Sequence, residues 1–521
     1  MLCRCASVRI SMASVHLKIR SLRCSADAAP HTDSYAPITV GPITQSEEQL
    51  KKLYDAGMRC ARMNFSHGSH EYHAKTIENV RKALGPKEAC AIMLDTKGPE
   101  IRTGKLVDGK EIKVEQGSTF TLKYFPDDPC GMVNKGCSEW ITQDYANFSK
   151  VLSVGKEVCI DDGLLSLTVT AINGTDVVTR VNNTVMLGET KGVNLPGTPV
   201  DLPAITEKDK SDLIFGVQQG VDLIAASFVR KAQDVLDIRK VLGHPGRDIM
   251  IFSKIESEEG VENFDEILEV SDGIMVARGD LGIEIPIQKV YTVQKMIIEK
   301  CNRVGKPVIT ATQMLESMIV NPRPTRAEVT DVANAVTQGT DCVMLSGETA
   351  KGKWPIECVK MMATICQTAE SALNYKEEYL RFSKHIGEGK QTNKVQEAVS
   401  ASVVKTALDV DASLLMVLTQ SGATARAIAK FKPQQRCIAI TPSESTARKL
   451  CLSRGVFPRV IGSMIGTEQV LSHNCSKLIE EQVISEGDIV VCSHGDNHSS
   501  PGSTSVLKVI VAKSVAGDFN N

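Results

Sequence analysis

Short apolar segments of strand length alternate along this chain with amphipathic segments of helical period, and this alternation constrains the fold more than any other feature. Eight strand-like segments are predicted at residues 37–40, 60–64, 91–95, 221–227, 249–255, 273–277, 307–312 and 341–346. Helical spacing of apolar residues marks the segments 46–57, 70–84, 290–304 and 327–339. Strands joined through helices run parallel. Eight such units predict an α/β fold of the (β/α)8 TIM barrel type.

A different pattern interrupts the series between the third and fourth strands, which lie over 100 residues apart. There Leu165, Leu167 and Val169 alternate with hydroxyl residues, which is the period of a half-buried strand. We therefore predict an inserted β-barrel-like domain at 99–202, between barrel parts at 35–98 and 203–375. At the C-terminal mouth of a barrel, where active sites lie, such a domain is expected to act as a lid.

A third region begins after residue 375. Residues 376–393 are polar and predict a linker. A second alternation then predicts helices at 395–408 and 424–431, and strands at 414–419, 437–441, 489–493 and 506–511. We therefore expect a separate, open α/β domain within 376–521.

The first 26 residues differ from the rest of the chain. They contain five serines, five basic residues and no acidic residue before Asp27. This composition is typical of an organelle transit peptide, and a disordered or mis-started N-terminus is an equally good interpretation. We exclude residues 1–34 from the fold. The expected location is cytoplasmic, or mitochondrial or plastid if the segment is a transit peptide.

Charge and cysteine content narrow the class of protein. Sixty Lys and Arg residues against 62 Asp and Glu leave a net charge of −2, so no general basic field favours nucleic acid. No apolar run approaches the ~20 residues of a membrane helix, and we expect no membrane partner. The 16 cysteines form no CxxC pair, which favours buried free thiols in a reducing compartment.

Charged and hydroxyl residues gather where the predicted barrel strands end. In a barrel these ends converge on one pocket. Neither GxxxxGK[ST] nor GxGxxG occurs, so a nucleotide is expected between lid and barrel mouth. The strand-end residues include Arg62, Asn64, Ser66, His67, Asp95, Thr96, Ser227, Lys254, Glu256, Arg278, Asp280, Thr312, Ser346 and Glu348.

Each group has a structural alternative. Lys254 and Glu256 share one strand face and form a simple ion pair in that interpretation. Glu256 and Asp280, from adjacent strand ends, also offer two hard oxygen ligands for Mg²⁺. Thr312 is either a site hydroxyl or a strand residue that caps a helix.

The polar residues after the second and third strands also have both a functional and a structural interpretation. Arg62 provides a fork for a phosphate. Alternating polar residues are also common as strand-edge decoration. The functional interpretation is a cage of oxygens for a monovalent cation, formed by Asn64, Ser66, Asp95 and Thr96.

Several long motifs then occur in one order along the chain. They are ARMNFSHGSHEYH from Ala61, LDTKGPEIRTG from Leu94, KGVNLPG from Lys191, SKIES from Ser253, SDGIMVARGDLGIEIP from Ser271, ATQMLESMIVNPRPTRAEVTDVANAV from Ala311 and DCVMLSGETAKG from Asp341. Through them the chain closely resembles the pyruvate kinase family, from about Gly41 to its end.

The resemblance implies a glycolytic enzyme that transfers the phosphoryl group of phosphoenolpyruvate to ADP, giving pyruvate and ATP. It implies Mg²⁺ (or Mn²⁺) and K⁺ as cofactors, the K⁺ dependence following from Glu100. It also implies a C-terminal regulatory domain and a homotetramer.

Individual roles follow from the resemblance by motif position. Arg62 would bind the transferring phosphate, Lys254 would stabilise its charge and the enolate, and Thr312 would help to deliver the proton. The remaining implied contacts are Ala277, Arg278 and Gly279 for the substrate carboxylate, Glu256 and Asp280 for the divalent metal, Asn64, Ser66, Asp95 and Thr96 for K⁺, and Asn64, His67, Arg102 and Lys191 for the nucleotide.

Two segments depart from the family pattern. The first strand is reduced to APITVGP, residues 36–42, which places barrel closure and part of the adenine pocket in question unless the gene model is wrong there. In the loop LTQSGATARAIAKFKP from Leu418, Gln420 and Ala423 stand where activated relatives carry basic residues. Thr419, Ser421, Gly422 and Thr424 then indicate a weaker or different sugar-phosphate effector, or an unliganded turn.

Two rival functions stay open at this point. A metal-dependent lyase acting on pyruvate or oxaloacetate would use the same two carboxylates and an enolate. A catalytically impaired paralogue, retained as a regulatory or binding subunit, is the alternative that the altered first strand suggests.

Overall fold

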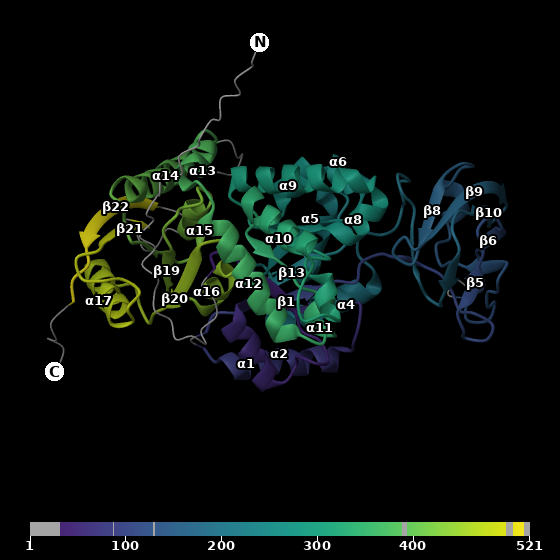
Figure 1. Cartoon of the computed structure of the whole chain (residues 1–521), viewed down its shortest axis with the longest axis horizontal. Coiled ribbons are helices and arrows are strands. Elements are labelled where there is room, and N and C mark those ends of the chain that lie inside the picture. Colours follow the sequence, from purple (N-terminus) through teal and green to yellow (C-terminus); the bar gives the residue numbers. More distant parts are fainter. Residues whose placement is uncertain (1–31, 87, 129–130, 388–392, 496–503, 515–521) are drawn as a thin grey trace, which may run out of the picture.

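The computed structural model describes residues 32–86, 88–128, 131–387, 393–495 and 504–514. Figure 1 shows a central barrel with the inserted β module at one end and the C-terminal domain at the other. The transit-like segment at 1–26 lies outside the described residues. Thr32, Asp33 and Ser34, assigned by the prediction to the N-terminal segment, hydrogen-bond to the buried carboxylate of Glu370.

The central sheet confirms the predicted fold class. Its eight parallel strands follow one another in chain order. They are β1 (Ala36–Thr39), β2 (Met58–Asn64), β3 (Ala91–Asp95), β13 (Leu223–Ala226), β14 (Met250–Ile255), β15 (Gly273–Ala277), β16 (Val308–Ala311) and β17 (Cys342–Val343).

Helices surround this sheet. The longer ones are α1 (Glu47–Ala56), α2 (His70–Leu84), α4 (Glu207–Gln219), α5 (Ala232–Leu242), α9 (Val290–Val304), α10 (Arg326–Gln338) and α12 (Pro355–Ser371). Shorter elements follow several strands: α6 (Glu258–Glu262), α7 (Phe264–Val270), α8 (Arg278–Glu284), η1 (Ile287–Lys289), η2 (Glu316–Ile319) and α11 (Gly347–Ala350).

Local sequence explains where these helices begin. Ser46 and Ser69 accept hydrogen bonds from backbone N–H groups in the first turns of α1 and α2. Thr206 with Asp209, and Thr325 with Glu328, form reciprocal capping boxes at α4 and α10.

The short first strand still closes the barrel. β1 pairs in parallel with β2 on one side. On the other side the N–H of Thr39 donates to Leu345 O at 3.0 Å, and the N–H of Leu345 donates to Pro37 O at 3.0 Å. The N–H of Val343 donates to Tyr35 O at 3.0 Å. The departure in APITVGP therefore leaves both edges of β1 paired.

The barrel interior is filled by side chains. Tyr35, Cys60, Met93, Phe252 and Ile309 belong to one buried cluster. Phe252 needs a glycine beside it, since a Cβ at Gly273 would lie 2.4 Å from its ring. The barrel is therefore a packed core, and ligands are restricted to its mouth.

In its described residues the inserted module is all β apart from one short helix, as its alternating pattern predicts. A seven-stranded sheet has the order β4-β12-β8-β9-β10-β6-β7, and β11 pairs with β5. The elements are β4 (Ile101–Arg102), β5 (Ile112–Val114), β6 (Thr119–Lys123), β7 (Trp140–Thr142), α3 (Phe148–Val151), β8 (Glu157–Ile160), β9 (Leu165–Asn173), β10 (Asp176–Val181), β11 (Val185–Leu187) and β12 (Gly192–Asn194).

The C-terminal domain has an open five-stranded sheet of order β20-β19-β18-β21-β22. Its strands are β18 (Leu414–Leu418), β19 (Cys437–Thr441), β20 (Val456–Val460), β21 (Ile489–Gly495) and β22 (Thr504–Val511). Its helices are α13 (Tyr375–Ser383), α14 (Lys394–Asp409), α15 (Ala423–Ala429), α16 (Glu444–Leu450) and α17 (Thr467–Glu480).

The linker prediction was wrong over its first half, which forms α13. Asn374 accepts from the N–H of Glu377 at the start of this helix, and Phe382 is fully buried among C-terminal side chains. This mostly polar helix is stabilised by the buried ring of Phe382. The polar composition of the segment does not predict that burial.

Two buried aspartates at the starts of barrel strands join the barrel to the C-terminal domain. Asp222 accepts from the N–H of Ile92 at 2.9 Å and from Nε of Arg448, on α16, at 3.0 Å. Asp341 accepts from the N–H of Val308 at 3.0 Å and from Nζ of Lys432 at 3.2 Å.

Two sequence expectations about class can be compared with the described residues. Twelve cysteines there are free, and all except Cys137 are buried, as predicted. No helix in the described part of the chain is both long and apolar enough to cross a membrane.

The importance of β1 can be tested by Ile38→Ala. Ile38 is fully buried, so losing its side chain should cost about 2–5 kcal/mol of stability and lower the thermal midpoint of the barrel. The control is Ile43→Ala, because Ile43 is 45% exposed and should change the midpoint little. Equal midpoints for the two variants would contradict the role assigned to β1.

Candidate active site

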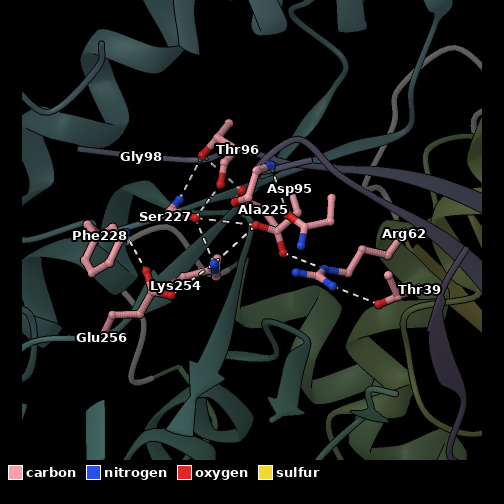
Figure 2. A network of polar contacts seen from close by, with 12 residues as sticks. Thr39, Arg62, Asp95, Thr96, Gly98, Ala225, Ser227, Phe228, Lys254 and Glu256 are labelled. Carbon is pink, nitrogen blue, oxygen red and sulfur yellow. Dashed lines mark hydrogen bonds and ion pairs between the residues drawn. The ribbon is translucent and has the colours of Figure 1, made fainter. Parts of the chain in front are cut away.

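A buried lysine lies at the centre of the barrel mouth. The ammonium group of Lys254, on β14, contacts Ser227 Oγ at 2.7 Å, Glu256 Oε1 at 3.0 Å and Asp95 Oδ1 at 3.2 Å. An ammonium group has three protons, so these three acceptors satisfy it completely. Figure 2 shows the acceptors converging on Nζ from different strand ends. The lysine is therefore fixed in position and fully charged.

Arg62 lies beside this lysine and shares its aspartate. Its Nε donates to Asp95 Oδ2 at 2.6 Å, and one terminal nitrogen donates to the hydroxyl of Thr39 at 2.8 Å. Thr39 Oγ1 in turn donates to Leu345 O at 2.9 Å. The closing strand β1 thus helps to orient the guanidinium group (Figure 2).

Burial and charge act against each other at these groups. Burial raises the pKa of Asp95, but Arg62 and Lys254 outweigh it, and the pKa lies below its usual range. Burial alone would lower the pKa of Lys254, but the negative charges of Asp95 and Glu256 outweigh burial and raise this pKa. Asp95 and Lys254 are therefore both charged at neutral pH. Two cations, Arg62 and Lys254, then share the Asp95 carboxylate at the barrel mouth.

Glu256 and Asp280 are the two carboxylates proposed for a divalent metal. Burial raises the pKa of Glu256, and burial together with Glu256 raises the pKa of Asp280 to about 7. Glu256 Oε2 also accepts from the N–H of Phe228 at 2.5 Å. Phe228 has a φ of +54°, an uncommon conformation for a bulky residue, and this geometry turns its N–H toward Glu256.

These residues fit a Mg²⁺ ion. Like-charged carboxylates buried near each other are stabilised by a cation. In the described residues no group of three or more His, Cys, Asp or Glu side chains is arranged for a metal. The ion would rest on two carboxylates and take its other ligands from water and substrate, which is how Mg²⁺ is usually bound.

Thr312 lies just past β16 in a strained turn. Thr312 and Gln313 have φ values of +75° and +54°. The guanidinium group of Arg278 supports this turn, since it donates to Ala311 O at 3.1 Å and to Thr312 O at 2.7 Å. A Cβ at Gly279 would lie 2.9 Å from Thr312 Cγ2, so glycine here allows a close approach of the backbone to Thr312. The 277–279 backbone and Thr312 are thus brought together, while the Arg278 side chain is directed to the turn.

The residues predicted to hold K⁺ lie at the ends of the neighbouring strands β2 and β3 and in the loops that follow them. Asn64 Oδ1 accepts from the N–H of Ser66 at 3.1 Å. Thr96 O accepts from Ser227 Oγ at 2.6 Å, and Thr96 Oγ1 accepts from the Ser227 N–H. Asp95 connects the pair of loops, because its carbonyl accepts from the N–H of Phe65.

A cavity of about 730 Å³ separates the β module from the barrel mouth. Three of the predicted nucleotide contacts, His67, Arg102 and Lys191, line it together with Asp280. Arg102 Nε donates to Glu100 Oε2 at 2.8 Å, and Lys191 Nζ contacts Asp161 Oδ1 at 2.9 Å. Asn64, the fourth predicted contact, is not among the lining residues of this cavity.

The predicted effector loop is a tight turn before α15. Thr419 Oγ1 accepts from the N–H of Gly422 at 3.0 Å, and Thr424 Oγ1 lies 2.6 Å from Thr504 Oγ1. Gly422 has a φ of +82°. Two of the three predicted hydroxyl groups, those of Thr419 and Thr424, are therefore already hydrogen-bonded within the domain.

Sequence reasoning did not assign two residues that the geometry places in the site. Thr39 contacts Arg62, and Ser227 contacts Lys254 and Thr96. Ser227 was recognised only as a strand-end hydroxyl, and Thr39 lies in the strand that departs from the family pattern. Position at a C-terminal strand end was the available signal for both.

Asp95→Ala tests the shared carboxylate. It leaves Arg62 without its carboxylate partner and Lys254 with Glu256 but not Asp95, so we expect a loss of about 3–5 kcal/mol in urea unfolding. Because the pKa of Asp95 is lowered, this contribution is present above its unfolded pKa and is lost as pH falls through the folded value.

The matched control is Asp237→Ala, which removes an exposed carboxylate paired with Lys240 and should change stability little. A loss for Asp95→Ala no larger than the control's would show that the three groups are not coupled.

Comparison with known proteins shows which family the chain resembles. The family model "Pyruvate kinase, barrel domain" matches residues 36–359, and "Pyruvate kinase, alpha/beta domain" matches residues 397–510. A pyruvate kinase of Clostridium acetobutylicum is 48% identical over 477 residues, covering 91% of this chain and 98% of the relative. The pyruvate kinase of Dictyostelium discoideum is 47% identical over 505 residues, covering 94% and 97%.

A solved structure supports the same assignment. The crystal structure of a pyruvate kinase from Cryptosporidium parvum superposes with a TM-score of 0.86 at 43% identity, covering 92% of this chain and 96% of that one. Sequence similarity and fold therefore agree, and the chain belongs to the pyruvate kinase family.

Proposed function

We propose that this chain transfers the phosphoryl group of phosphoenolpyruvate to ADP at the barrel mouth, with Arg62, Lys254 and Thr312 as its catalytic residues. The observation that carries the proposal is the position of the Lys254 ammonium group. Ser227, Asp95 and Glu256 hold it, and Arg62 pairs with the same Asp95. Phosphoryl transfer is catalysed mainly by positioning and charge neutralisation, and a rigid, buried cation provides both.

In the proposed reaction a terminal oxygen of ADP attacks phosphorus, and the bond from phosphorus to the enol oxygen breaks. The bonding pair stays on the enol oxygen. Arg62 binds the oxygens of the phosphoryl group during its transfer. Lys254 stabilises the negative charge on those oxygens and on the enolate that remains. Protonation of the enolate carbon, assisted by the Thr312 hydroxyl, gives pyruvate.

Glu256 and Asp280 are proposed to hold Mg²⁺ or Mn²⁺, which supplies charge neutralisation to the substrate oxygens when bound. Asn64, Ser66, Asp95 and Thr96 are proposed to hold K⁺. The 277–279 backbone orients the substrate carboxylate.

The nucleotide is proposed to occupy the cavity under the β module. Asn64, His67, Arg102 and Lys191 are its proposed contacts, and the last three line that cavity. The β module would then exclude water from the phosphates as a lid. We also propose that the β module spans residues 99–202, that the barrel comprises 35–98 and 203–375, and that the C-terminal domain begins at 376.

We also propose that the working enzyme is a homotetramer located in the cytoplasm. A sugar-phosphate effector is proposed to bind at Thr419, Ser421, Gly422 and Thr424.

Pyruvate formation tests the reaction directly. With phosphoenolpyruvate, Mg²⁺ and K⁺ present, a lactate dehydrogenase-coupled assay should report pyruvate only after ADP is added. Chelation by EDTA should abolish turnover, and replacing K⁺ with a tetraalkylammonium ion should lower it strongly. Pyruvate from oxaloacetate without ADP would instead identify a lyase, and no turnover at saturation would identify an impaired paralogue.

Lys254→Met tests the charge-stabilising role. Met keeps the length of the side chain and removes its charge, so turnover should fall by at least about 1,000-fold. Circular dichroism and Mg²⁺ binding should change little. Lys300→Met is the control, because Lys300 forms a surface pair with Asp265 and should retain full turnover. Near-normal turnover of Lys254→Met would refute the role.

A further inference from the structure

Three residues of the proposed site lie where β2 leads into α2: Asn64 ends β2, and Ser66 and His67 follow in the turn. The placement of the latter two depends on the backbone of residues 65–68, which belongs to neither element. The N–H of His67 donates to Asn64 O at 3.2 Å, which closes the turn. The carbonyls of Phe65 and His67 need partners from elsewhere in the fold.

Side chains from two helices supply these partners. Lys208, on α4, donates from Nζ to Phe65 O at 2.9 Å. His73, in the first turn of α2, has its Nε2 2.8 Å from His67 O. The two contacts hold the backbone on either side of Ser66.

His73 is placed under this turn by packing as well. Its ring stacks on Phe65, with centroids 4.1 Å apart and planes 16° from parallel, and it is only 2% exposed. Gly68 has a φ of +79°, and a Cβ there would lie 3.2 Å from His73 Nε2. The ring therefore fills the space directly beneath the turn.

The chemistry of the contact fixes the proton on His73. A carbonyl oxygen only accepts, so Nε2 must carry the hydrogen and donate. Nδ1 is buried and has no hydrogen-bond partner among the described residues. An apolar side chain would stack on Phe65 without burying an unpaired nitrogen, so the distinctive contribution of histidine here is its donor to His67 O.

We propose that His73 is a positioning residue for the nucleotide: its Nε2–H holds the His67 carbonyl and thereby keeps His67 facing the cavity under the β module. The inference rests on the proposed function, because it takes the occupant of that cavity to be ADP. His73 itself acts through His67 and does not line the cavity.

The test compares His73→Leu with His73→Gln. Leu removes the donor, whereas the Gln amide nitrogen reaches about as far as Nε2 and retains it. At saturating K⁺ and phosphoenolpyruvate, His73→Leu should raise KM for ADP about tenfold, the effect of one lost hydrogen bond. KM for phosphoenolpyruvate and kcat should change less than about threefold, and His73→Gln should restore KM for ADP to within about twofold.

Thr76→Val is the matched control. Thr76 is buried on the same helix, and its hydroxyl donates to Tyr72 O within α2 and not to a carbonyl of residues 65–68. This nearly isosteric change also removes one buried hydrogen bond, so it should leave KM for ADP unchanged. If His73→Leu does not fold, His73→Asn replaces it, because the Asn amide is too short to reach the position of Nε2.

Equilibrium dialysis with ADP separates this inference from the proposed reaction. The dissociation constant of ADP should rise about tenfold in His73→Leu, whether or not wild-type protein turns over phosphoenolpyruvate. Two results would overturn the positioning role: ADP binding as tight in the Leu (or Asn) variant as in Thr76→Val, or a Gln variant as weak as the Leu (or Asn) variant.

Discussion

The structure of the site depends on keeping a lysine charged inside a barrel. Moving an ammonium group out of water costs several kcal/mol unless acceptors surround it. Asp95, Ser227 and Glu256 provide them from the ends of β3, β13 and β14. Because these strands are adjacent and parallel, their ends lie at one level of the barrel. The register of the sheet therefore determines whether Lys254 can be buried at all.

The same register distributes charge around the mouth. Asp95 is shared by Arg62 and Lys254, so its single negative charge serves two cations. Glu256 balances Lys254 from the other side, and Asp280 adds a further carboxylate near it. An anion with several oxygens and a divalent cation both find partners here. This balance explains why buried groups of both signs are stable in one small volume.

Much of this arrangement could be predicted from the sequence. The strands 91–95 and 273–277 and the helices 70–84 and 290–304 were predicted with the bounds observed, because each has a clear apolar period and a polar or glycine boundary. The convergence of Arg62, Asp95 and Lys254 followed from their places at strand ends.

Other features could not be predicted, for physical reasons. The helix α13 depends on Phe382, whose burial is decided by the rest of the domain. The strand β20 contains Pro458 at the sheet edge and lacks a regular apolar period. The contact of Thr39 with Arg62 joins two residues on neighbouring strands, and the rotamers that bring them together are set by three-dimensional packing. Local patterns describe elements well, but the pairings between their side chains require the folded chain.

The aspartates at the opposite end of the barrel have a consequence for cooperativity. Asp222 and Asp341 each bond a strand N–H and a basic side chain of the C-terminal domain. Melting of that domain alone would strip both carboxylates of their countercharges while leaving them at the base of an intact sheet. Such an intermediate is costly, so heat and denaturant should disrupt the two units in a single concerted step.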